Sequence, residues 1–328
     1  MSGPLAFYTE NHGNPVISMN SQHSSFSEAI KAEALRLGFD ACGIAAASPA
    51  DPEDHLGNWL RHGFHADMEW IARTKTLRQD VTLKLPGTNS VIMVARNYYA
   101  PDSESTRQTG RIARYARGRD YHTILFPLLK RLAAFLNTLQ EGILSYAEVD
   151  TGPVLERTWA ARAGLGWIGK NGLLIRKNGG SWYFLGAILT TLELPPDPPL
   201  PDYCGQCRAC LDACPTNALI EPRILDAQKC IAYHTIENRG EIPESLHSAM
   251  GAWIFGCDLC QEACPWNRFA EITTESQFLP QSGIACPDLE ELLQLDEAAF
   301  KKRFKHSPLL RAKHSGILRN ARIARANT

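Results

Sequence analysis

Three observations predict a mixed α/β (α+β) domain, followed by a ferredoxin-like, cysteine-rich domain and a short helical segment at the C-terminus. Helical and strand-like hydrophobic patterns alternate over roughly the first 195 residues. Prolines at 195, 196, 198, 199 and 201 then mark a stiff boundary. Eight cysteines follow between Cys204 and Cys264. The predicted divisions are a flexible extension at 1–24, the α/β domain at 25–198, the cysteine-rich domain at 199–287 and a basic helical segment at 288–328.

The α/β domain is expected to begin with a helix. Residues 1–24 are polar and unpatterned, which is typical of a mobile extension. Ser25 and Ser27 are possible N-caps of a helix that Gly38 would end. Further elements follow from hydrophobic periodicity and turn residues. They are buried strands at 41–46 and 90–99, a helix at 121–139, a strand at 144–149, a short helix at 154–163, and a hairpin of strands 173–176 and 182–192 across the turn at 178–180.

The eight cysteines have the spacing of a bacterial ferredoxin with two [4Fe–4S] clusters. The first motif, C-x2-C-x2-C-x3-C-P, runs from Cys204 to Pro215. The second, C-x2-C-x3-C-P, runs from Cys257 to Pro265, and Cys230 stands between them. In such a pattern the cysteine before the proline ligates the other cluster. The predicted ligands are Cys204, Cys207, Cys210 and Cys264 for cluster 1, and Cys214, Cys230, Cys257 and Cys260 for cluster 2.

Zinc binding and disulfide bonds fit these cysteines less well than iron–sulfur clusters do. Structural zinc more often shows two C-x-x-C pairs without a regular proline after the last cysteine. Disulfides need an oxidising compartment, and the first residues lack the charged start and apolar run of a secretory signal. Cys42 and Cys286 are left over, and we expect both to be inert thiols. The pattern therefore predicts one-electron transfer.

The composition is that of a soluble chain with an ordinary core. The 328 residues suffice for about two domains, and 44% are hydrophobic. No apolar run reaches the roughly 18 residues of a membrane span. We expect a cytoplasmic monomer that binds no membrane. Nine Lys or Arg residues and no Asp or Glu lie between Lys301 and Thr328, and five arginines lie at 107–119. Such segments attract polyanions, although a solvated face is the alternative.

Two motifs suggest cofactors but are discounted. Gly164, Gly166 and Gly169 spell the dinucleotide fingerprint, yet a helix precedes them and a strand follows, which inverts the order that the fingerprint requires. A tight helix-to-strand loop explains them better. Asp120 and His122 begin D-x-H-x-x-G, a pattern of corrinoid proteins, but Leu125 replaces its glycine. We expect His122 to be a hydrogen-bonded residue at a helix start.

Three segments ahead of the cysteines carry a family resemblance. They are RDYH at 119–122, VDTGPVLER at 149–157 and AGLGWIGKN at 163–171. With the cysteine framework, they resemble epoxyqueuosine reductase, the cobalamin-dependent enzyme of queuosine biosynthesis, over roughly residues 25–325. The resemblance implies a cobalamin-binding α/β domain and the reduction of epoxyqueuosine to queuosine at the wobble position of tRNA. It also implies an external low-potential electron donor.

The resemblance implies roles for individual residues. Asp150 is the implied proton donor, provided that burial raises the pKa of its carboxyl, although an aspartate in a turn is the alternative. The implied cofactor-binding residues are Arg78, Ala113, Arg114, Asp150, Lys170, Asn171 and Asp258, the last placed where cluster and corrin meet. The implied tRNA-binding residues are Asn238 and Arg239, in a loop after Cys230, and Lys301, Arg303 and Arg319 in the basic segment. Cluster 2 is expected to lie nearer the corrinoid.

Two other functions stay open on the sequence. The first is a corrinoid reductase of small molecules, similar to reductive dehalogenases, which typically carry an export signal that is not seen here. The second is a ferredoxin-type electron carrier without catalysis of its own. A tRNA-modifying enzyme should bind tRNA with a strong salt dependence, whereas the other two should not.

Overall fold

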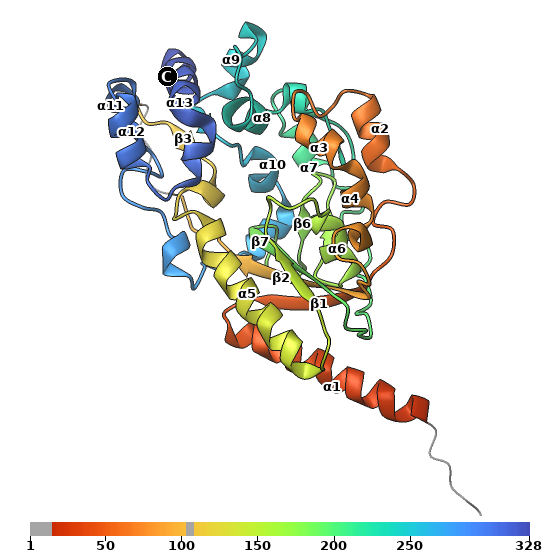
Figure 1. Ribbon diagram of the computed structural model, residues 1–328. Helices are drawn as coiled ribbons and strands as arrows, with labels where there is room; N and C mark the ends of the chain where they lie inside the picture. Colours follow the sequence, from red (N-terminus) through yellow and green to blue (C-terminus); the bar gives the residue numbers. More distant parts are fainter. Residues whose placement is uncertain (1–14, 103–107) are drawn as a thin grey trace, which may run out of the picture.

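The computed structural model describes residues 15–102 and 108–328 (Figure 1). The α/β domain is built on a four-stranded antiparallel sheet in the order β1-β2-β7-β4. The strands are β1 (Ala41–Ala46), β2 (Ser90–Asn97), β7 (Tyr183–Thr190) and β4 (Ser145–Glu148). Every residue of β2 is buried, because it lies between two strands and beneath helices on both faces. The predicted mixed α/β domain is confirmed.

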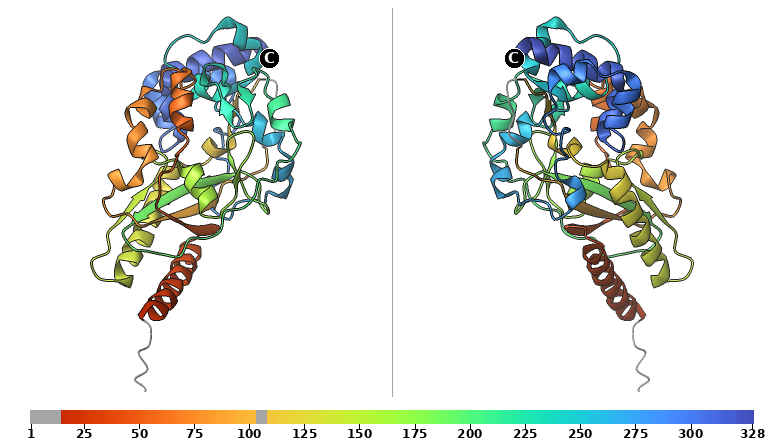
Figure 2. Two further views of the ribbon diagram at one scale, coloured as in Figure 1. Left: turned by 90° about the vertical axis from the view of Figure 1, so that its right-hand side faces the viewer. Right: turned by 90° about the vertical axis from the view of Figure 1, so that its left-hand side faces the viewer.

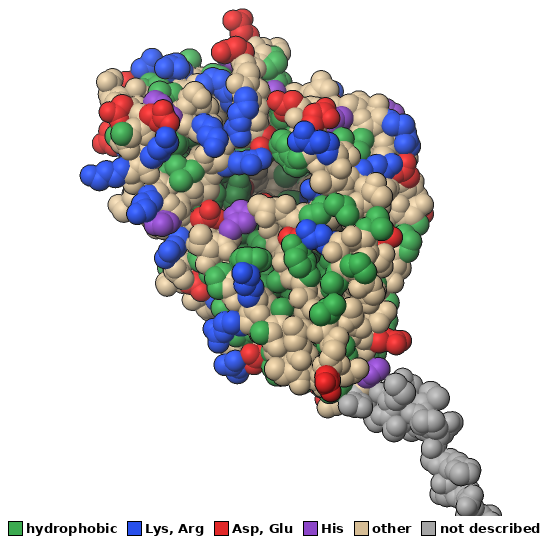
Figure 3. All heavy atoms as spheres, viewed as in Figure 1, with side chains coloured by type: hydrophobic (Ala, Val, Ile, Leu, Met, Phe, Trp, Pro, Cys, Tyr) green, Lys and Arg blue, Asp and Glu red, His purple; other side chains and the backbone are tan. Residues whose placement is uncertain are grey.

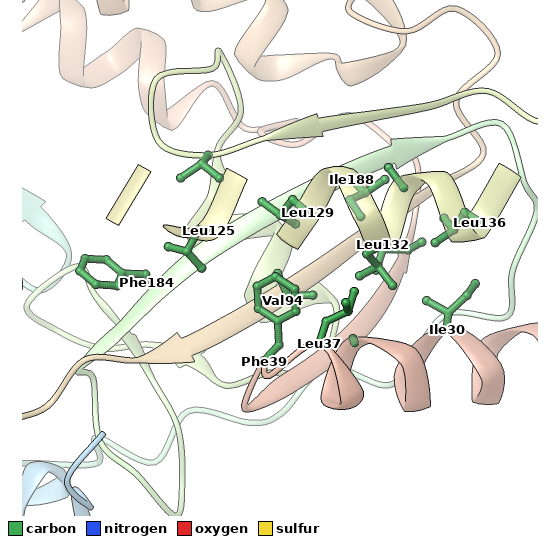
Figure 4. Close-up of a cluster of buried hydrophobic side chains, with 14 of the residues drawn as sticks. Ile30, Leu37, Phe39, Val94, Leu125, Leu129, Leu132, Leu136, Phe184 and Ile188 are labelled. Atoms are coloured by element: carbon green, nitrogen blue, oxygen red, sulfur yellow. The ribbon is translucent and has the colours of Figure 1, made fainter. Parts of the chain in front are cut away.

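Two long helices cover one face of the sheet. They are α1 (Pro15–Arg36) and α5 (Tyr121–Leu139). Their apolar stripes meet the sheet in a cluster that Figure 4 shows, with Ile30 and Leu37 from α1 facing Leu129 and Leu132 from α5. The helix α6 (Glu156–Arg162) packs on the opposite face through Trp159, which is fully buried. The sheet is therefore a rigid platform for the loops at its edges.

The prediction that Ser25 and Ser27 cap the first helix is wrong. Helix α1 begins at Pro15, so both serines lie inside it and residues 15–24 are not an extension. The hydroxyl of Ser27 donates to the carbonyl oxygen of His23, one turn earlier. This back-bond satisfies a serine within a helix, so the residue type did not mark the start. Residues 1–14 of the predicted extension lie outside the described residues.

The predicted hairpin is also wrong. The turn at 178–180 forms, because Arg176 and Gly180 exchange two backbone hydrogen bonds. After it, however, β7 enters the centre of the main sheet, where it pairs with β2 and β4. The strand before the turn, β6 (Leu174–Ile175), pairs with β5 (Trp167–Ile168) instead. An eight-residue, mostly buried strand gains more apolar burial at the centre of a sheet than in a two-stranded hairpin.

The cysteine-rich region consists of short elements. They are α7 (Ala209–Asp212), β8 (Leu219–Glu221), β9 (Ile224–Leu225), α8 (Ile231–Ile236), α9 (Glu244–Met250), β10 (Trp253–Phe255) and α10 (Leu259–Glu262). The helices α7 and α10 carry cysteines of the two motifs and contact each other. β10 pairs in parallel with β3 (Arg111–Ile112) of the α/β domain. The two regions are thus joined by a shared sheet.

The C-terminal segment is a folded layer, as predicted. It contains α11 (Leu289–Leu293), α12 (Glu297–Arg303) and α13 (Lys313–Asn327). Ile317 of α13 and Phe300 of α12 share one buried cluster with Phe255 of β10 and Ile112 of β3. These helices lie at the opposite end of the molecule from α1 (Figures 1 and 2). The basic segment is therefore anchored by its apolar face, while most of its charged side chains, such as Lys301 and Arg311, are exposed.

The remaining helices stand beside the sheet. They are α2 (His55–Arg61), α3 (Glu69–Arg73) and α4 (Lys75–Gln79). In Figure 1 they lie on the right, on the side of the molecule away from α11 and α12. Trp59 of α2 donates to the carbonyl oxygen of Leu225 in the cysteine-rich region, at 2.6 Å. No helix within the described ranges is long and apolar enough to cross a membrane.

Candidate functional site

A hollow opens in the surface between the C-terminal helices and the α/β domain (Figure 3). Basic side chains gather on the rim that the C-terminal helices form. Asp150 interacts with charges from both of these parts of the molecule, His122 on α5 and Arg311 in the 3-10 helix Pro308–Ala312 of the C-terminal segment. Its side chain is 58% exposed, yet burial is the largest single influence on its pKa. That combination is typical of a residue in a concave wall.

The backbone holds Asp150 in a strained position. It follows β4 and has a φ of 50°, in the left-handed region that costs a non-glycine residue about 1–2 kcal/mol. Its N–H donates to Oε1 of Glu156 at 2.7 Å. Glu156 begins α6, whose packing against the sheet fixes its position. The carboxyl group at the start of α6 therefore stabilises the turn that presents Asp150.

His122 connects two aspartates. Asp120 is the N-cap of α5 and accepts hydrogen bonds from the backbone N–H of His122 and, at 2.8 Å, from its Nδ1. The Nε2 atom lies 3.4 Å from Oδ2 of Asp150. Burial lowers the pKa of His122, but the two carboxylates outweigh it and raise the pKa to about 9. The prediction of a hydrogen-bonded residue at a helix start is confirmed through Nδ1, whereas Nε2 lies at ion-pair distance from Asp150 without a hydrogen bond.

The same contacts act on Asp150. Burial raises the pKa of its carboxyl, but hydrogen bonds from His122 and Tyr121 outweigh burial and lower it. The condition set for Asp150 as an acid, a net raised pKa, is therefore not met in the structure. Because a protonated imidazole stands beside the carboxylate, the exchangeable proton of the pair resides on His122 near neutral pH. The pair as a whole can still supply a proton at Asp150.

A second carboxyl lies directly behind Asp150. Burial and the negative charge of Asp150 raise the pKa of Glu156 to about 8, so its carboxyl is mostly protonated at neutral pH. Arg157 is coupled to both acids and donates from Nη1 to the carbonyl oxygen of Gly172 at 2.5 Å. Arg78 of α4 is also within electrostatic range of Glu156 and Asp150. The wall thus holds two acids, two arginines and one histidine.

Asp258 lies between this wall and the cysteines. Its side chain is 3% exposed, and Oδ2 accepts the backbone N–H of Arg114 at 2.7 Å. Burial raises the pKa of Asp258 to about 6. The guanidinium of Arg114 is buried in ion pairs with Asp102 at 2.5 Å and Glu262 at 2.7 Å. Ala113 is 1% exposed, and its N–H donates to Phe255. Arg114 and Ala113 therefore position the loop that carries Asp258.

Lys170 and Asn171 lie against the cysteine loops. The Nζ atom of Lys170 donates to the carbonyl oxygens of Gly205 at 2.7 Å and Cys207 at 2.8 Å. Nδ2 of Asn171 is 3.4 Å from the carbonyl oxygen of Cys260. These contacts give both residues a structural role in the cysteine loops, and their predicted cofactor contacts stay predictions.

The eight cysteines come together from three segments of the chain. Cys204, Cys207, Cys210 and Cys264 surround one cavity of about 200 Å³. Cys260 interacts electrostatically with Cys257 and Cys230, and Cys230 with Cys214. Within the described residues, no three His, Cys, Asp or Glu side chains converge closely enough to bind a single metal ion. Thiols spread around a cavity suit a cluster better than a zinc ion.

Electrostatic neighbours and contacts link the cysteines to Asp150. Cys207 is exposed, whereas Cys210 is buried. Cys260 interacts with both Cys210 and Asp258, and Asp258 acts on Tyr115, which Asp150 also affects. A line of contacts also leads from Asp150 through His122, Tyr121 and Tyr115 to the backbone of Arg114, whose N–H Asp258 accepts, so the loop of Cys257 and Cys260 is linked to Asp150. Burial raises the pKa of the leftover Cys42 thiol to about 12, consistent with an inert thiol.

The predicted tRNA-binding residues differ in availability. Asn238 is buried and hydrogen-bonded to His234 and Glu241. Arg319 donates to the carbonyl oxygens of His234, Asn238 and Gly240. Arg303 donates to the carboxylate of Glu291 and to the carbonyl oxygen of Gly283. Arg239 donates to the carbonyl oxygens of Ile236 and Arg311. Lys301 is exposed and forms an ion pair with Glu297 at 2.6 Å.

Sequence reasoning assigned no role to several residues of the hollow. The VDTGPVLER segment contained Glu156 and Arg157, but only its aspartate was singled out. Tyr121 adjoins His122 and hydrogen-bonds Asp150. Nothing in the sequence singled out Arg311 beyond its place in the basic segment. In the structure it forms an ion pair with Glu237 at 2.7 Å and interacts with Asp150. The one local signal available was a glutamate three residues after the D-T-G-P segment.

Known proteins match the chain over most of its length. A family model described as "Epoxyqueuosine reductase QueG, DUF1730" matches residues 78–151, and one for a 4Fe-4S double cluster binding domain matches residues 203–267. An epoxyqueuosine reductase of Gloeobacter violaceus is 46% identical over 90% of this chain and 94% of its own. That of Escherichia coli K12 is 40% identical over 93% and 82%.

Solved structures agree with the sequence comparison. A crystal structure of epoxyqueuosine reductase with an epoxyqueuosine-modified tRNA-Tyr stem loop matches with a TM-score of 0.85 and 32% identity, covering 92% of this chain and 81% of that one. The Bacillus subtilis epoxyqueuosine reductase matches with the same score and identity, covering 92% and 82%. That structure is described with its aspartate-bearing catalytic loop swung out of the active site.

Proposed function

The chain belongs to the epoxyqueuosine reductase family, and from this membership we propose that it reduces epoxyqueuosine to queuosine in tRNA. The observation that carries the proposal is Asp150, which lies beside His122 and is linked through Tyr121, Tyr115 and Asp258 to the loop of the predicted cluster 2 ligands. The reaction opens an epoxide, forms an alkene and releases water. It consumes two electrons and two protons. The structure offers a route for each.

The two cysteine sets would hold [4Fe–4S] clusters. The cavity within the first set and the mutual interactions within the second support the predicted ligands. Lys170 and Asn171, with their bonds to backbone carbonyls of both loops, would keep the thiols in place. Cubane clusters transfer one electron at a time, so two transfers are needed for each turnover.

The hollow would hold cobalamin. When bound, a corrinoid supplies low-potential electrons at the reacting carbon. The wall fits this cofactor, since it pairs aromatic Tyr115 and Tyr121 with the guanidinium groups of Arg78 and Arg157, which can bind the amide groups of a corrin. His122 would not act as a cobalt ligand, because both of its ring nitrogens face aspartates. Asp258, together with the backbone of Ala113 and Arg114, would border the cofactor on the cluster side.

Asp150 would deliver a proton to the departing oxygen. An oxygen that leaves an epoxide develops negative charge, so a positioned proton donor lowers the barrier. His122 would transfer its proton from Nε2 to Asp150, and Asp150 would pass it to the oxygen. Asp120 would keep the imidazole ring oriented through Nδ1. The solved relative with a mobile, aspartate-bearing catalytic loop supports this role, because Asp150 also lies in a loop.

The tRNA would reach the hollow with its anticodon loop. In a relative, an epoxyqueuosine-modified stem loop binds the enzyme. Basic side chains lie on the rim that the C-terminal helices form (Figure 3), and exposed Arg239, Lys301 and Arg311 are suited to contact phosphates. A single-stranded loop allows its modified base to turn into a pocket at low cost.

Anaerobic reconstitution tests this function. The protein would be loaded with iron, sulfide and cobalamin, reduced with dithionite and incubated with tRNA that carries epoxyqueuosine. Nucleoside analysis should show queuosine replacing epoxyqueuosine. Unchanged epoxyqueuosine with both clusters verified would contradict the proposal, and turnover of a halogenated aromatic compound instead would favour a small-molecule reductase.

A further inference from the structure

The predicted site of cluster 1 reaches the protein surface. Cys207 is exposed, whereas Cys210 is only 9% exposed. The cavity that these thiols line is also bordered by Tyr203 and Trp266. The line of contacts from Asp150 through His122, Tyr121 and Tyr115 ends at Asp258, in the loop of Cys257 and Cys260, and not in the loop of Cys207. An electron that enters the protein from outside would therefore arrive at this edge.

Three aromatic side chains continue from the cavity onto the surface. The ring of Trp266 lies 6.1 Å from that of Tyr203 and 6.0 Å from that of Phe269. Tyr203 is 38% exposed and Phe269 is 43% exposed. Exposed aromatic side chains that touch each other are uncommon on a surface without a partner, and they are enriched at the centres of interfaces.

Basic side chains flank these rings. Nζ of Lys177 lies 5.4 Å from the ring centre of Tyr203, and the guanidinium of Arg268 lies 4.6 Å from that of Phe269. Neither has a carboxylate within ion-pair distance among the described residues. Arg208 directly follows Cys207, and its one carboxylate neighbour, Asp212, is 3.7 Å away with both side chains more than 60% exposed. These cations are therefore available to a partner.

We propose that this surface, which we call the cluster 1 rim, is the docking site of a small acidic protein that carries one electron. The rim consists of Lys177, Tyr203, Arg208, Trp266, Arg268 and Phe269. The inference rests on the proposed function and adds the nature of the electron donor. Two successive encounters each oxidise the carrier by one electron and reduce cluster 1 by one electron. The two electrons and two protons then convert the epoxide to an alkene and water.

Charge and position favour a redox protein over RNA at the rim. The modified nucleoside must reach Asp150, whose charged neighbours are His122 on α5 and Arg311 of the C-terminal segment, whereas the rim surrounds the loop of Cys207. An acidic carrier matches the cations, and its exposed redox group would approach Cys207 over the aromatic rings. Electron-transfer encounters are small and short-lived, so a patch of this size suffices. Rim charges in such encounters mainly raise the association rate and its dependence on salt.

A charge-reversal variant tests the rim. Lys177→Glu/Arg208→Glu changes two exposed residues that do not line the cluster cavity, and Lys130→Glu/Arg131→Glu on α5 is the matched control. The probe is an acidic plant-type [2Fe–2S] ferredoxin. Its affinity for each cluster-loaded protein is measured by calorimetry at low and high salt. Its KM in epoxyqueuosine reduction is measured beside the rate with dithionite.

The rim variant should bind ferredoxin roughly 10- to 100-fold more weakly at low salt and show a KM raised to a similar degree. Its dithionite rate should equal that of the control. Equal ferredoxin binding by the two variants would overturn the proposal. So would a rim variant that loses affinity for tRNA and keeps its affinity for ferredoxin, because the rim would then bind RNA. Failure of the unmodified protein with dithionite would instead contradict the proposed function.

Discussion

The Nε2 atom of His122 lies 3.4 Å from Oδ2 of Asp150. The histidine opens α5, and the aspartate follows β4, so the packing of helix and sheet brings them together. Asp120 holds the other ring nitrogen. This arrangement keeps a proton near the position where an epoxide oxygen would leave, and it makes the acid–base behaviour of the site measurable without any cofactor.

The pH dependence of stability should report the charge on His122. A raised pKa of about 9 means that the ion pairs stabilise the fold fully below about pH 6.5 and are lost as the pH rises through 9. The difference in free energy of unfolding between the unmodified protein and His122→Gln should therefore shrink from pH 6 to pH 10. Denaturant titrations at both pH values measure it. A constant difference would show that His122 is neutral in the folded protein.

Two substitutions of Glu156 should distinguish its role as a hydrogen-bond acceptor for Asp150 from its role as an acid. Gln can accept the N–H of Asp150 as Glu does, whereas Ala cannot. We expect Glu156→Gln to keep most of the activity and Glu156→Ala to lose it roughly 10- to 100-fold, because Asp150 then leaves its left-handed conformation. Reconstituted turnover of modified tRNA measures both. An equal loss of activity in the two variants would show that the acidic proton of Glu156 is what matters, and not its hydrogen bond to Asp150.

The buried network around Arg114 should be important for stability. Arg114→Met leaves the buried carboxylate of Asp258 without its neighbouring cation and should destabilise the protein by about 3–5 kcal/mol. Arg111→Met is the control, since Arg111 forms a partly exposed ion pair with Glu262 and should cost about 1 kcal/mol or less. Urea denaturation of both variants measures the difference, and similar values would contradict a structural role for the network.

Gly256, directly before Cys257, should not tolerate a side chain. It has a φ of 69°, and a Cβ there would come 2.5 Å from Cβ of Ala113. Gly142→Ala is the matched control, because Gly142 has a φ of 77° and an open environment. We expect about 1 kcal/mol of destabilisation for the control and about 2–4 kcal/mol for Gly256→Ala, together with a loss of bound iron. Equal stability of the two variants would contradict this account of the loop.

Local signals predicted part of the fold. The apolar spacing in α5 and the buried run in β1 gave both elements with their predicted bounds. The cysteine spacing predicted a ligand set whose four thiols lie around one cavity, and metal binding there stays a prediction. Motifs of this kind are readable because the ligands of one cluster repeat at short intervals along the chain.

The rest depends on contacts between distant segments. Whether β7 pairs with β6 or joins β2 and β4 is decided by burial in the whole sheet, which a local turn signal does not contain. The pairing of His122 with Asp150 likewise requires the packing of α5 on β4. Sequence reasoning therefore singled out the aspartate through its motif, but the condition of a raised pKa is not met, because the neighbouring histidine was not visible in the sequence.

Nucleoside analysis with Asp150→Asn tests the central claim most directly. The variant and the unmodified protein are both reconstituted with clusters and cobalamin, and their absorption spectra should be the same. The unmodified protein should convert epoxyqueuosine to queuosine, while the variant should be slower by a factor of about 100 to 10,000, because asparagine has no acidic proton. Turnover by Asp150→Asn at the unmodified rate would contradict the role of Asp150 and of the histidine pair that supplies it.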